Sequence, residues 1–546
     1  MSSSPMLRSP TGSDIRRIES APLLRDNTHP DGYLYGTVDS ESIEQTSKSK
    51  KSVTPLPLRQ VLLLALMRMS APIAYSQIFP LTSPSSSLTS SYQMMNDMGV
   101  ADDPSQVGYY SGLVDSTFSF VQLFTCLRVG MLADQIGRKP VLLIGLFGIM
   151  ICTILFGLSK SFAWTIATRA VAGALSGNTL IINSAVGDIT DETNQAQAYA
   201  WIGLAYNVAS VLGPAIGGTF AKPEETFPNT LGHIGLFKRY PYLCPCVICA
   251  LVAFTGLVCC ALFFKETVTH RRPSLKQVAS YYSSEDVSAE VLSARDLSAW
   301  QLALNPVLFS IFRSFFILNL LNTSVSVVFS LFAYTPIEKG GLARDPNEIG
   351  YAMSFSGVLS GTLEVMFLAA LQRRFGAVTL LRCFTALWPI IFLLFPLTHL
   401  IALFTMDVPA LGGDNTVSSV LTKGDGYGHE HPGSSVVVWV AISILLLLQR
   451  IATMAYPVNL ILTRNAVPSD EILGTVFGLS QLIGSSARTI GPAFISSLFA
   501  FSKEHNVVNG NFVWVVMFAI SLLGIWASMY VSDGQEDAPT EENLDE

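Results

Sequence analysis

One acidic residue, Asp115, lies in a polar stripe within a segment that is otherwise apolar. The stripe consists of Gly108, Ser111, Asp115, Ser119 and Gln122, which recur at intervals of three or four residues. This spacing places them on one face of an α-helix. A carboxyl group on such a face can bind a proton on one side of a barrier and release it on the other. We therefore predict that Asp115 binds a proton that drives the activity.

A second chemical feature is the stretch GMLADQIGRKP, residues 130–140, which concentrates charge between two apolar runs. Gly130 and Gly137 permit close backbone approach and positive φ. Asp134 can meet a basic group or a helix N-terminus, and Arg138 and Lys139 can anchor the next helix at an anionic membrane surface. A basic anchor beside a turn explains two basic residues, but not the ordered set of Gly, Asp, Gly, Arg and Lys.

Membrane-length apolar segments position these residues. Charged residues make up 13% of the 546 and apolar residues 50%, whereas soluble domains are about 25% charged. The apolar residues fall into runs near the roughly 20 residues that a spanning helix needs. The predicted spans cover residues 59–81, 106–130, 140–160, 162–187, 196–221, 241–265, 305–334, 347–371, 377–402, 434–463, 472–501 and 511–531. We predict an all-α integral membrane protein in which two six-helix bundles surround a central cavity.

The same pattern divides the chain into five parts. They are a disordered cytosolic tail (1–58), a first bundle (59–265), a cytosolic linker (266–304), a second bundle (305–531) and an acidic cytosolic tail (532–546). Basic residues outside the spans concentrate on the cytosolic side if both termini lie there, as the positive-inside rule requires. RAVAG and LGPAIGG in the first bundle have weak counterparts, QRIATM and IGPAFIS, in the second. Repeated bundles of this kind are typical of transporters whose site lies between them.

The stretch GMLADQIGRK resembles the loop signature GxLxDxxGRK of the major facilitator superfamily. In that family the loop joins a charge network that closes the cytosolic side when the cavity opens outward. The resemblance assigns this gating role to Gly130, Asp134, Gly137, Arg138 and Lys139, with Asp188 at the end of the fourth span as a partner for Arg138.

Two further motifs agree with this resemblance. RAVAG resembles the family's RxxxG in the fourth span, through Arg169 and Gly173. LGPAIGG in the fifth span resembles the GPxxGG of the drug/proton antiporter branch, which has twelve spans. This element is carried by Gly213, Pro214, Gly217 and Gly218. Its proline removes a backbone donor and its glycines allow a neighbouring helix to approach, which predicts a kinked, tightly packed helix.

Within that branch, RMSAPIAYSQIFP and DITDETNQAQAYAWIG look similar to fungal transporters related to tetracycline exporters and to zinc-induced facilitator-like proteins. The chain departs from that subgroup at two positions. Ala71 stands where the subgroup has an acidic residue before the proline of span one, and Val129 stands where it has a tryptophan. The missing acid removes one proton site and is a second reason to select Asp115.

Polar residues at helical spacing inside spans are candidates for contact with a substrate, because such residues usually face the bundle interior. The candidates are Arg68, Asn183, Asn319, Asn322, Tyr456 and Gln481. Interhelical hydrogen bonds, worth about 0.6 kcal/mol each, would produce the same stripes. Arg68, Arg313 and Glu364 are costlier to bury, so we expect a partner or a watery cavity beside each.

These features predict a transporter that exports a small organic compound, or sequesters it in a vacuole, in exchange for protons by alternating access. Two alternatives stay open. One is a nutrient receptor that does not transport. The other is a transporter of ions or metal chelates, suggested by His429 and His431 in a polar loop. The chain lacks HExxH, GxSxG and a phosphate loop, so an enzyme is not predicted.

The predicted partners are the substrate, protons and membrane lipid, with no nucleic acid, cofactor or metal, and the chain is expected to be a monomer. The CPCVIC cluster at Cys244 is interpreted as packing thiols rather than a zinc site. Glu19, Leu23 and Leu24 have the spacing of an acidic dileucine signal for a sorting adaptor. That signal favours a vacuolar or lysosomal membrane, with the plasma membrane as the alternative.

Replacement of Asp115 by Asn should allow normal insertion but abolish uphill transport driven by a pH gradient, because Asn cannot bind and release a proton at this position. Substrate binding should be retained. The measurement is pH-driven uptake together with binding in detergent. Loss of the folded protein, with rescue by neutralising Arg68 as well, would instead show a structural ion pair.

Overall fold

Most of the predicted spans are included in the computed structural model, which describes residues 54–76, 104–228, 230, 233–267, 299–337, 340–344, 346–406, 432–467 and 469–532. The sorting-signal residues Glu19, Leu23 and Leu24 lie outside the described residues, as do His429 and His431. Asp115 belongs to a described helix, but its side chain is also outside the description. The proposals that concern these residues, and the five predicted parts of the chain, stay predictions.

Each span of the predicted first bundle contains helix. The long helices there are α2 (Leu58–Ser76), α4 (Pro104–Ile136), α5 (Arg138–Gly157), α6 (Phe162–Leu175), α7 (Asn178–Ile189), α8 (Gln195–Phe220) and α11 (Leu243–Phe263). Two short helices, α9 (Pro223–Thr226) and α10 (Gly235–Arg239), lie between α8 and α11. We refer to this set as the first half.

The predicted second bundle is also helical in its described part. It contains α15 (Pro306–Tyr334), α16 (Pro346–Phe375), α17 (Ala377–Thr385), α18 (Leu387–Met406), α19 (Pro432–Thr453), α20 (Ala455–Asn465), α21 (Leu473–Glu504) and α22 (Phe512–Met529). The short helix α14 (Ala299–Leu304) precedes α15, and a 3-10 turn, η4 (Asp470–Ile472), precedes α21. We refer to this set as the second half.

Three predicted spans are each divided into two helices. The fourth is interrupted at Ser176 and Gly177, the ninth at Ala386 and the tenth at Met454. At the first break the hydroxyl of Ser176 donates to the carbonyl of Gly173 at 2.7 Å, which satisfies a carbonyl at the end of α6. The hydropathy pattern predicts length but not such breaks, because they depend on local hydrogen bonds.

The two halves repeat one pattern of helix pairs. In the first half α2 packs against α8, α5 against α11 and α4 against α6. The corresponding pairs in the second half are α15 with α21, α18 with α22 and α16 with α19. These are the first and fifth, third and sixth, and second and fourth spans of each half. The repetition supports the duplication inferred from the sequence.

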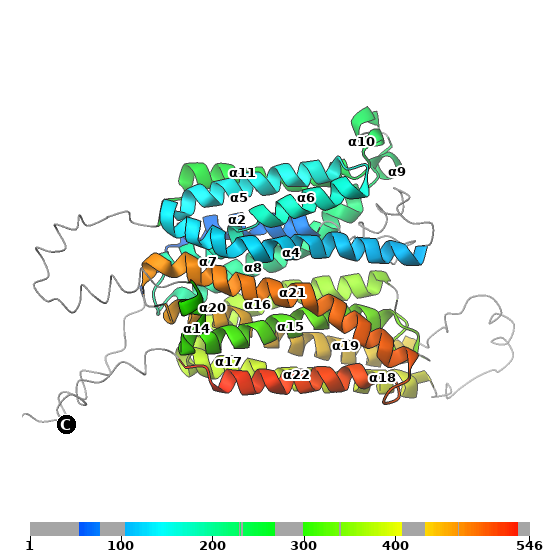
Figure 1. Ribbon diagram of the computed structural model, residues 1–546. Coiled ribbons are helices and arrows are strands. Elements are labelled where there is room, and N and C mark those ends of the chain that lie inside the picture. The colour runs from blue at the N-terminus through cyan, green and yellow to red at the C-terminus, as the bar shows by residue number, and fades with distance from the viewer. Residues whose placement is uncertain are drawn as a thin grey trace, which may run out of the picture. The chain divides into compact units, whose positions relative to one another are not determined.

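The halves meet through two pairs of long helices, α4 with α21 and α8 with α16. Figure 1 shows α4 and α21 side by side where the two halves meet. Gly130 of α4 makes this contact close, because a Cβ there would lie 2.3 Å from the carbonyl oxygen of Gly474 and 3.2 Å from the Cα of Gly478. The contact therefore requires backbone without side chains at this point.

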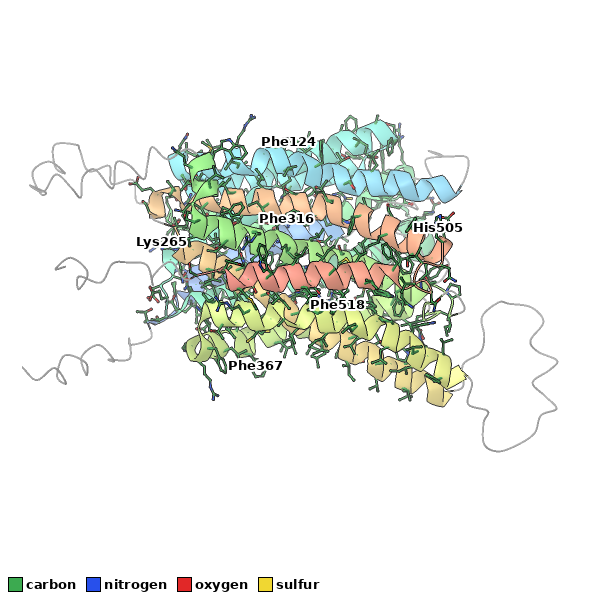
Figure 2. The ribbon with its side chains drawn as sticks, turned by 60° about the horizontal axis from the view of Figure 1, so that its bottom comes forward. Phe124, Lys265, Phe316, Phe367, His505 and Phe518 are labelled. Atoms are coloured by element: carbon green, nitrogen blue, oxygen red, sulfur yellow. The ribbon has the colours of Figure 1, made fainter. Side chains whose placement is uncertain are left out.

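Large apolar side chains cover the outside of the helices. Phe124 and Phe367, labelled in Figure 2, keep 62% and 46% of their surface exposed. Ten segments of the described helices are long and apolar enough to cross a membrane. The helices α2 and α21 are not among them, and both carry arginine within the span, Arg68 and Arg488. An apolar exterior of this extent is the surface that lipid covers.

Replacement of Gly130 by Ala should destabilise the protein by about 1–3 kcal/mol, because the new Cβ meets backbone that cannot rotate away. The measurement is the thermal unfolding midpoint of the purified protein in detergent. Gly235→Ala is the matched control, since a Cβ at Gly235 has no atom within 4 Å. Equal midpoints for the two variants would contradict the close contact of α4 and α21.

Candidate functional site

The charged stretch at residues 130–140 is almost entirely helical. The helix α4 continues to Ile136, beyond the predicted end of the second span at residue 130, and only Gly137 separates it from α5. Gly137 adopts φ 103°, which favours glycine. A Cβ on Gly137 would also lie 2.6 Å from the carboxylate of Glu266. That carboxylate accepts hydrogen bonds from the backbone N–H groups of Arg138 at 2.8 Å and Lys139 at 3.0 Å, so it caps the N-terminus of α5.

Arg138 is buried, with 1% of its side chain exposed. It donates to Asp134 and, through Nε, to Asp188 at 3.3 Å. Asp188 also accepts from the hydroxyl of Thr267 at 2.8 Å. The expectation that Arg138 anchors α5 at the lipid surface was therefore wrong, because two carboxylates hold the guanidinium inside the protein. Lys139 donates to the carbonyl of Phe264 at 2.8 Å.

Asp134 joins the two halves by capping α21. Its carboxylate accepts hydrogen bonds from the N–H of Gly474 at 2.8 Å and from the N–H and hydroxyl of Thr475 at 2.6 Å each. The first N–H groups of a helix have no partner within the helix, and the helix dipole favours a negative charge beside them. We call this set of hydrogen bonds the α21 latch. It brings the predicted gating residue Asp134 into contact with a segment 340 positions away.

Two further hydrogen bonds join the halves at the same end of the helices. Gln195 donates to Asn465 at 3.2 Å, and Arg464 Nε donates to the carbonyl of Gly187 at 3.1 Å. We call this end, where α4 meets α5, the latch end. Lys265 and His505 mark the latch end and the opposite end in Figure 2.

The loop between α7 and α8 lies outside the spans and carries an ionised carboxylate. Hydrogen bonds from Thr193 and from the hydroxyl of Thr54 hold the pKa of Asp191 below its usual value. The folded state therefore gains stability from ionised Asp191 at neutral pH and loses it as the pH falls through the lowered pKa. This interaction ties the segment before α2 to the end of the fourth span.

The motif residues of the fourth and fifth spans lie where helices pack against one another. Arg169 is buried with its guanidinium 4.2 Å from the centre of the Phe156 ring, beside a cavity of about 30 Å³ within the first half. Gly173 faces α4, where a Cβ would lie 2.4 Å from the carbonyl oxygen of Phe118. The helix α8 is continuous through Pro214, and Gly213 and Gly217 are buried while Gly218 is partly buried.

Gln122 of α4 is the centre of a polar network between the halves. Its Nε2 donates to the hydroxyl of Ser176 at 2.9 Å and to the same residue's carbonyl at 3.3 Å, at the break in the fourth span. Its Oε1 accepts from Ser485 at 2.9 Å, Arg488 at 3.4 Å and Gln481 at 3.5 Å, all on α21. The amide therefore donates within the first half and accepts from the second half, so it links the break in the fourth span to α21.

Aromatic rings accompany the arginines beside this network. The guanidinium of Arg68 lies 4.8 Å from the centre of the Tyr206 ring, and both belong to the first half. In the second half Tyr456 packs against Phe315 with ring centres 5.1 Å apart. Arg68 lies near Tyr456, and it is close enough to Arg488 for the two positive charges to interact. We call Arg68, Gln122, Tyr206, Asn319, Tyr456, Gln481, Ser485 and Arg488 the central cluster.

Four of the six predicted substrate residues belong to this cluster: Arg68, Asn319, Tyr456 and Gln481. Asn319 accepts from Arg488 at 3.5 Å, which places it in the network. Asn183 is buried in α7, where its carbonyl accepts from Tyr199, and Asn322 lies one turn beyond Asn319. Among the described residues, no hydrogen bond joins the side chains of Asn183 and Asn322 to the cluster.

Tyr206 was not predicted, because it belongs to no polar stripe and its role depends on a neighbouring helix. Gln122, Ser485 and Arg488 stood in polar stripes of the second and eleventh spans, and helical spacing was a signal that could have selected them.

Glu364 of α16 forms a separate contact between the halves. It is 5% exposed, and the structure gives its Oε2 no hydrogen-bond partner among the described residues. The carboxylate faces Gly203 of α8, where a Cβ would lie 2.0 Å from Oε2. Arg450 is near enough for its charge to interact with that of Glu364, but it donates to Ser356 at 2.9 Å and 3.2 Å. An ionised carboxylate in this setting is expensive, so the arrangement suits the neutral acid.

Comparisons with known proteins agree with this architecture. The model of the Major Facilitator Superfamily matches residues 64–424. The chain belongs to the major facilitator superfamily. It is 31% identical to the major facilitator-type transporter psiT2 of Psilocybe cyanescens over 89% of this chain and 93% of that protein. It is 26% identical to the protein ZINC INDUCED FACILITATOR 1 of Arabidopsis thaliana over 88% and 93% of the two chains.

A solved structure shows the same fold. The human organic anion transporter MFSD10 (TETRAN) superposes with a TM-score of 0.59 at 19% identity, over 87% of this chain and all of that one. The resemblance to fungal facilitators and zinc-induced facilitators is thus confirmed, as are the all-helical membrane fold and the multi-pass character of the chain. The roles of individual site residues in this facilitator stay predictions.

The cysteines of the CPCVIC segment are buried in α11. Across the described part of the chain, no group of three or more His, Cys, Asp or Glu residues gathers where it could hold a metal ion.

Replacement of Asp134 by Asn should weaken the α21 latch, because the amide nitrogen cannot accept hydrogen bonds and the negative charge is lost. A hydrogen bond to a charged group contributes about 1.5–3 kcal/mol, so amides in the first turn of α21 should exchange hydrogen at least about tenfold faster. Hydrogen–deuterium exchange of the peptide that contains Gly474 and Thr475 measures this. Arg373, exposed at the equivalent position of the second half, gives the control Arg373→Gln. Unchanged exchange in folded Asp134→Asn would disprove the latch.

Proposed function

We infer that this facilitator moves a small organic compound across a membrane by alternating access and couples the movement to protons. The observation that carries the inference is the distribution of hydrogen bonds between the halves. Among the described residues, these bonds lie between the latch end and the level of Gln122, and none lies beyond that level. Such an arrangement suits a state that is closed at the latch end and joined at the central cluster.

Two long helices connect the latch to the central cluster. The helix α4 contains both Gln122 and Asp134, and α21 contains both Thr475 and Arg488. Arg488 lies thirteen positions after Thr475 in this helix, a distance of about 20 Å along its axis. A rigid movement of either helix therefore changes both regions together. Substrate binding at the centre can favour opening or closing at the latch only if the ligand binds the two states unequally.

The polar cluster suits an organic molecule better than a bare ion. Its side chains are amides, hydroxyls, guanidiniums and phenols contributed by both halves, whereas hard cations prefer several oxygen ligands. We place the latch end in the cytosol, because the basic residues outside the spans favour that orientation. The resemblance of Gly213, Pro214, Gly217 and Gly218 to an antiporter motif supports export from the cytosol, or sequestration into a vacuole or lysosome.

Two carboxylates within spans can bind the coupled proton. Asp115 was selected from the sequence. Glu364 is the candidate that the tertiary structure adds, because its carboxylate is buried between the halves at Gly203. Ionisation of Glu364 would place a charge in this contact, and protonation would remove it. Proton binding at Glu364 therefore favours contact of α8 with α16, which links protonation to the conformational cycle.

Reconstitution into liposomes tests the proposed function. A pH gradient should drive accumulation of at least one member of a panel of small organic compounds, and addition of that compound without a gradient should move protons. A pH dye inside the vesicles measures the second effect. Binding of compounds without movement of either compound or protons would favour the alternative of a receptor that does not transport.

Replacement of Glu364 by Gln should abolish pH-driven accumulation and retain exchange of labelled for unlabelled substrate, because exchange needs no change of protonation. The two rates are measured in the same proteoliposomes. Thr362→Val is the control, since Thr362 lies exposed on the same helix and donates to the carbonyl of Val358 in its own helix. Accumulation at the parental rate by Glu364→Gln would exclude Glu364 as the proton carrier.

A further inference from the structure

Positive charge exceeds negative charge in the middle of the spans. Arg68, Arg450 and Arg488 lie at this level, whereas Glu364 is the single carboxylate there among the described side chains. The excess remains if Asp115, which stands on α4 two turns from Gln122, is counted as ionised. Burial of cations in a membrane protein is costly unless an anion or water compensates them. The three arginines therefore differ from ordinary packing residues.

The three arginines differ in whether a negatively charged side chain lies near them. Arg450 has Ser356 and the nearby charge of Glu364. Arg488 donates to neutral groups, at 2.9 Å to Ser485, 3.4 Å to Gln122 and 3.5 Å to Asn319. Arg68 contacts the Tyr206 ring, and the described part of the chain offers it no hydrogen bond. Arg68 and Arg488 thus have no anionic partner among the described residues.

These two guanidiniums come from opposite halves and repel each other. Arg68 belongs to α2 and Arg488 to α21, and they are close enough for their charges to interact. An anion between them replaces this repulsion with two charge-assisted hydrogen-bonding interactions. It therefore stabilises the state in which the halves are together. A ligand with this differential effect is the kind that drives an alternating-access cycle.

The rings beside the arginines fit a flat apolar body. Tyr206 keeps 46% of its surface exposed although it lies under Arg68 near the middle of α8. Tyr456, from the second half, lies near the same arginine and packs against Phe315. Aromatic rings bind planar ligands by stacking or edge contacts. The surroundings of Arg68 thus offer a cation for a head group and exposed aromatic surface for a body.

We propose that Arg68 and Arg488 bind the anionic group of an aromatic organic anion, with Tyr206 and Tyr456 against its ring. This proposal rests on the proposed transport function and adds the class of substrate. The guanidinium of each arginine presents N–H donors to a carboxylate, sulfonate or phosphate. A cationic compound at the same place would meet two positive charges, and a neutral isostere would leave them uncompensated. Among ligands of the same shape, the site should therefore prefer the anionic one.

Binding to the purified parent protein tests the charge preference. The probes are 2-naphthoate, 2-naphthalenesulfonate and 2-naphthyl phosphate, with 2-naphthamide as the neutral counterpart and 2-naphthylmethylamine as the cationic one. We expect at least one anion to raise the thermal unfolding midpoint and to bind with a measurable Kd, and the amide and amine to bind at least about tenfold more weakly. Equal or tighter binding of the amide or amine, or binding of none of the three anions, would overturn the proposal.

Variants of the arginines test the assignment. Arg68→Gln and Arg488→Gln should each weaken binding of the tightest anion by about tenfold or more, and Arg68→Lys should weaken it less because the charge remains. Arg313→Gln is the matched control. Arg313 is also an arginine over an aromatic ring, 4.6 Å from Trp526, but it donates to the carbonyl of Ala527 at the latch end. Anion affinity that folded Arg68→Gln and folded Arg488→Gln both leave at the parental value would exclude this site.

Transport assays separate the failure of this proposal from the failure of the proposed function. Proton-coupled accumulation of 2-naphthylmethylamine or 2-naphthamide without accumulation of any anion would sustain transport and overturn the anion site. Anion binding that depends on Arg68, without movement of anion or protons in liposomes, would sustain the site and refute the transport function.

Discussion

The contact of Asp134 with the N-terminus of α21 is the interaction on which the arrangement of the two halves depends. A helix N-terminus inside a membrane protein needs acceptors for its first N–H groups, because lipid supplies none. In this chain the acceptor is a carboxylate from the other half, at 2.8 Å from Gly474 and 2.6 Å from Thr475. Arg138, which also pairs with Asp188, offsets part of its charge. The latch therefore joins helix capping, an ion pair and helix contact in one place.

Within the described residues only the first half supplies such a latch, although the chain is built from repeated halves. Gly137 and Gly376 both precede a helix and both adopt positive φ, 103° and 76°. The position of Asp134 in the first half corresponds to Arg373 in the second, and Arg373 is exposed. A glycine with positive φ before a helix thus occurs in both halves, while among the described residues the capping carboxylate occurs in the first half. Closure at the latch end is consequently asymmetric.

Polar side chains in the centre of the molecule also depend on hydrogen-bond partners from the protein, because lipid supplies none. Gln122 donates to Ser176 at the break in the fourth span and accepts from Ser485 of α21. Glu364 and Arg68 lack comparable partners among the described residues, and both lie where the halves meet or approach. Groups that the protein leaves unsatisfied are suited to bind what passes through it, a proton at Glu364 and an anionic ligand at Arg68. The helices α4 and α21 connect these sites to the latch.

The sequence by itself determined the membrane class, the positions of the spans and the motif residues, because apolar length and helical spacing are local properties of the chain. It also selected Asp188 as a partner for Arg138 through the resemblance to a known family. Only the tertiary structure decided that Arg138 is buried rather than at the lipid surface, that Asp134 caps α21, and that Tyr206 and Glu364 lie between helices. Those features join residues far apart in the chain, and no local pattern specifies which distant backbone will approach a given side chain.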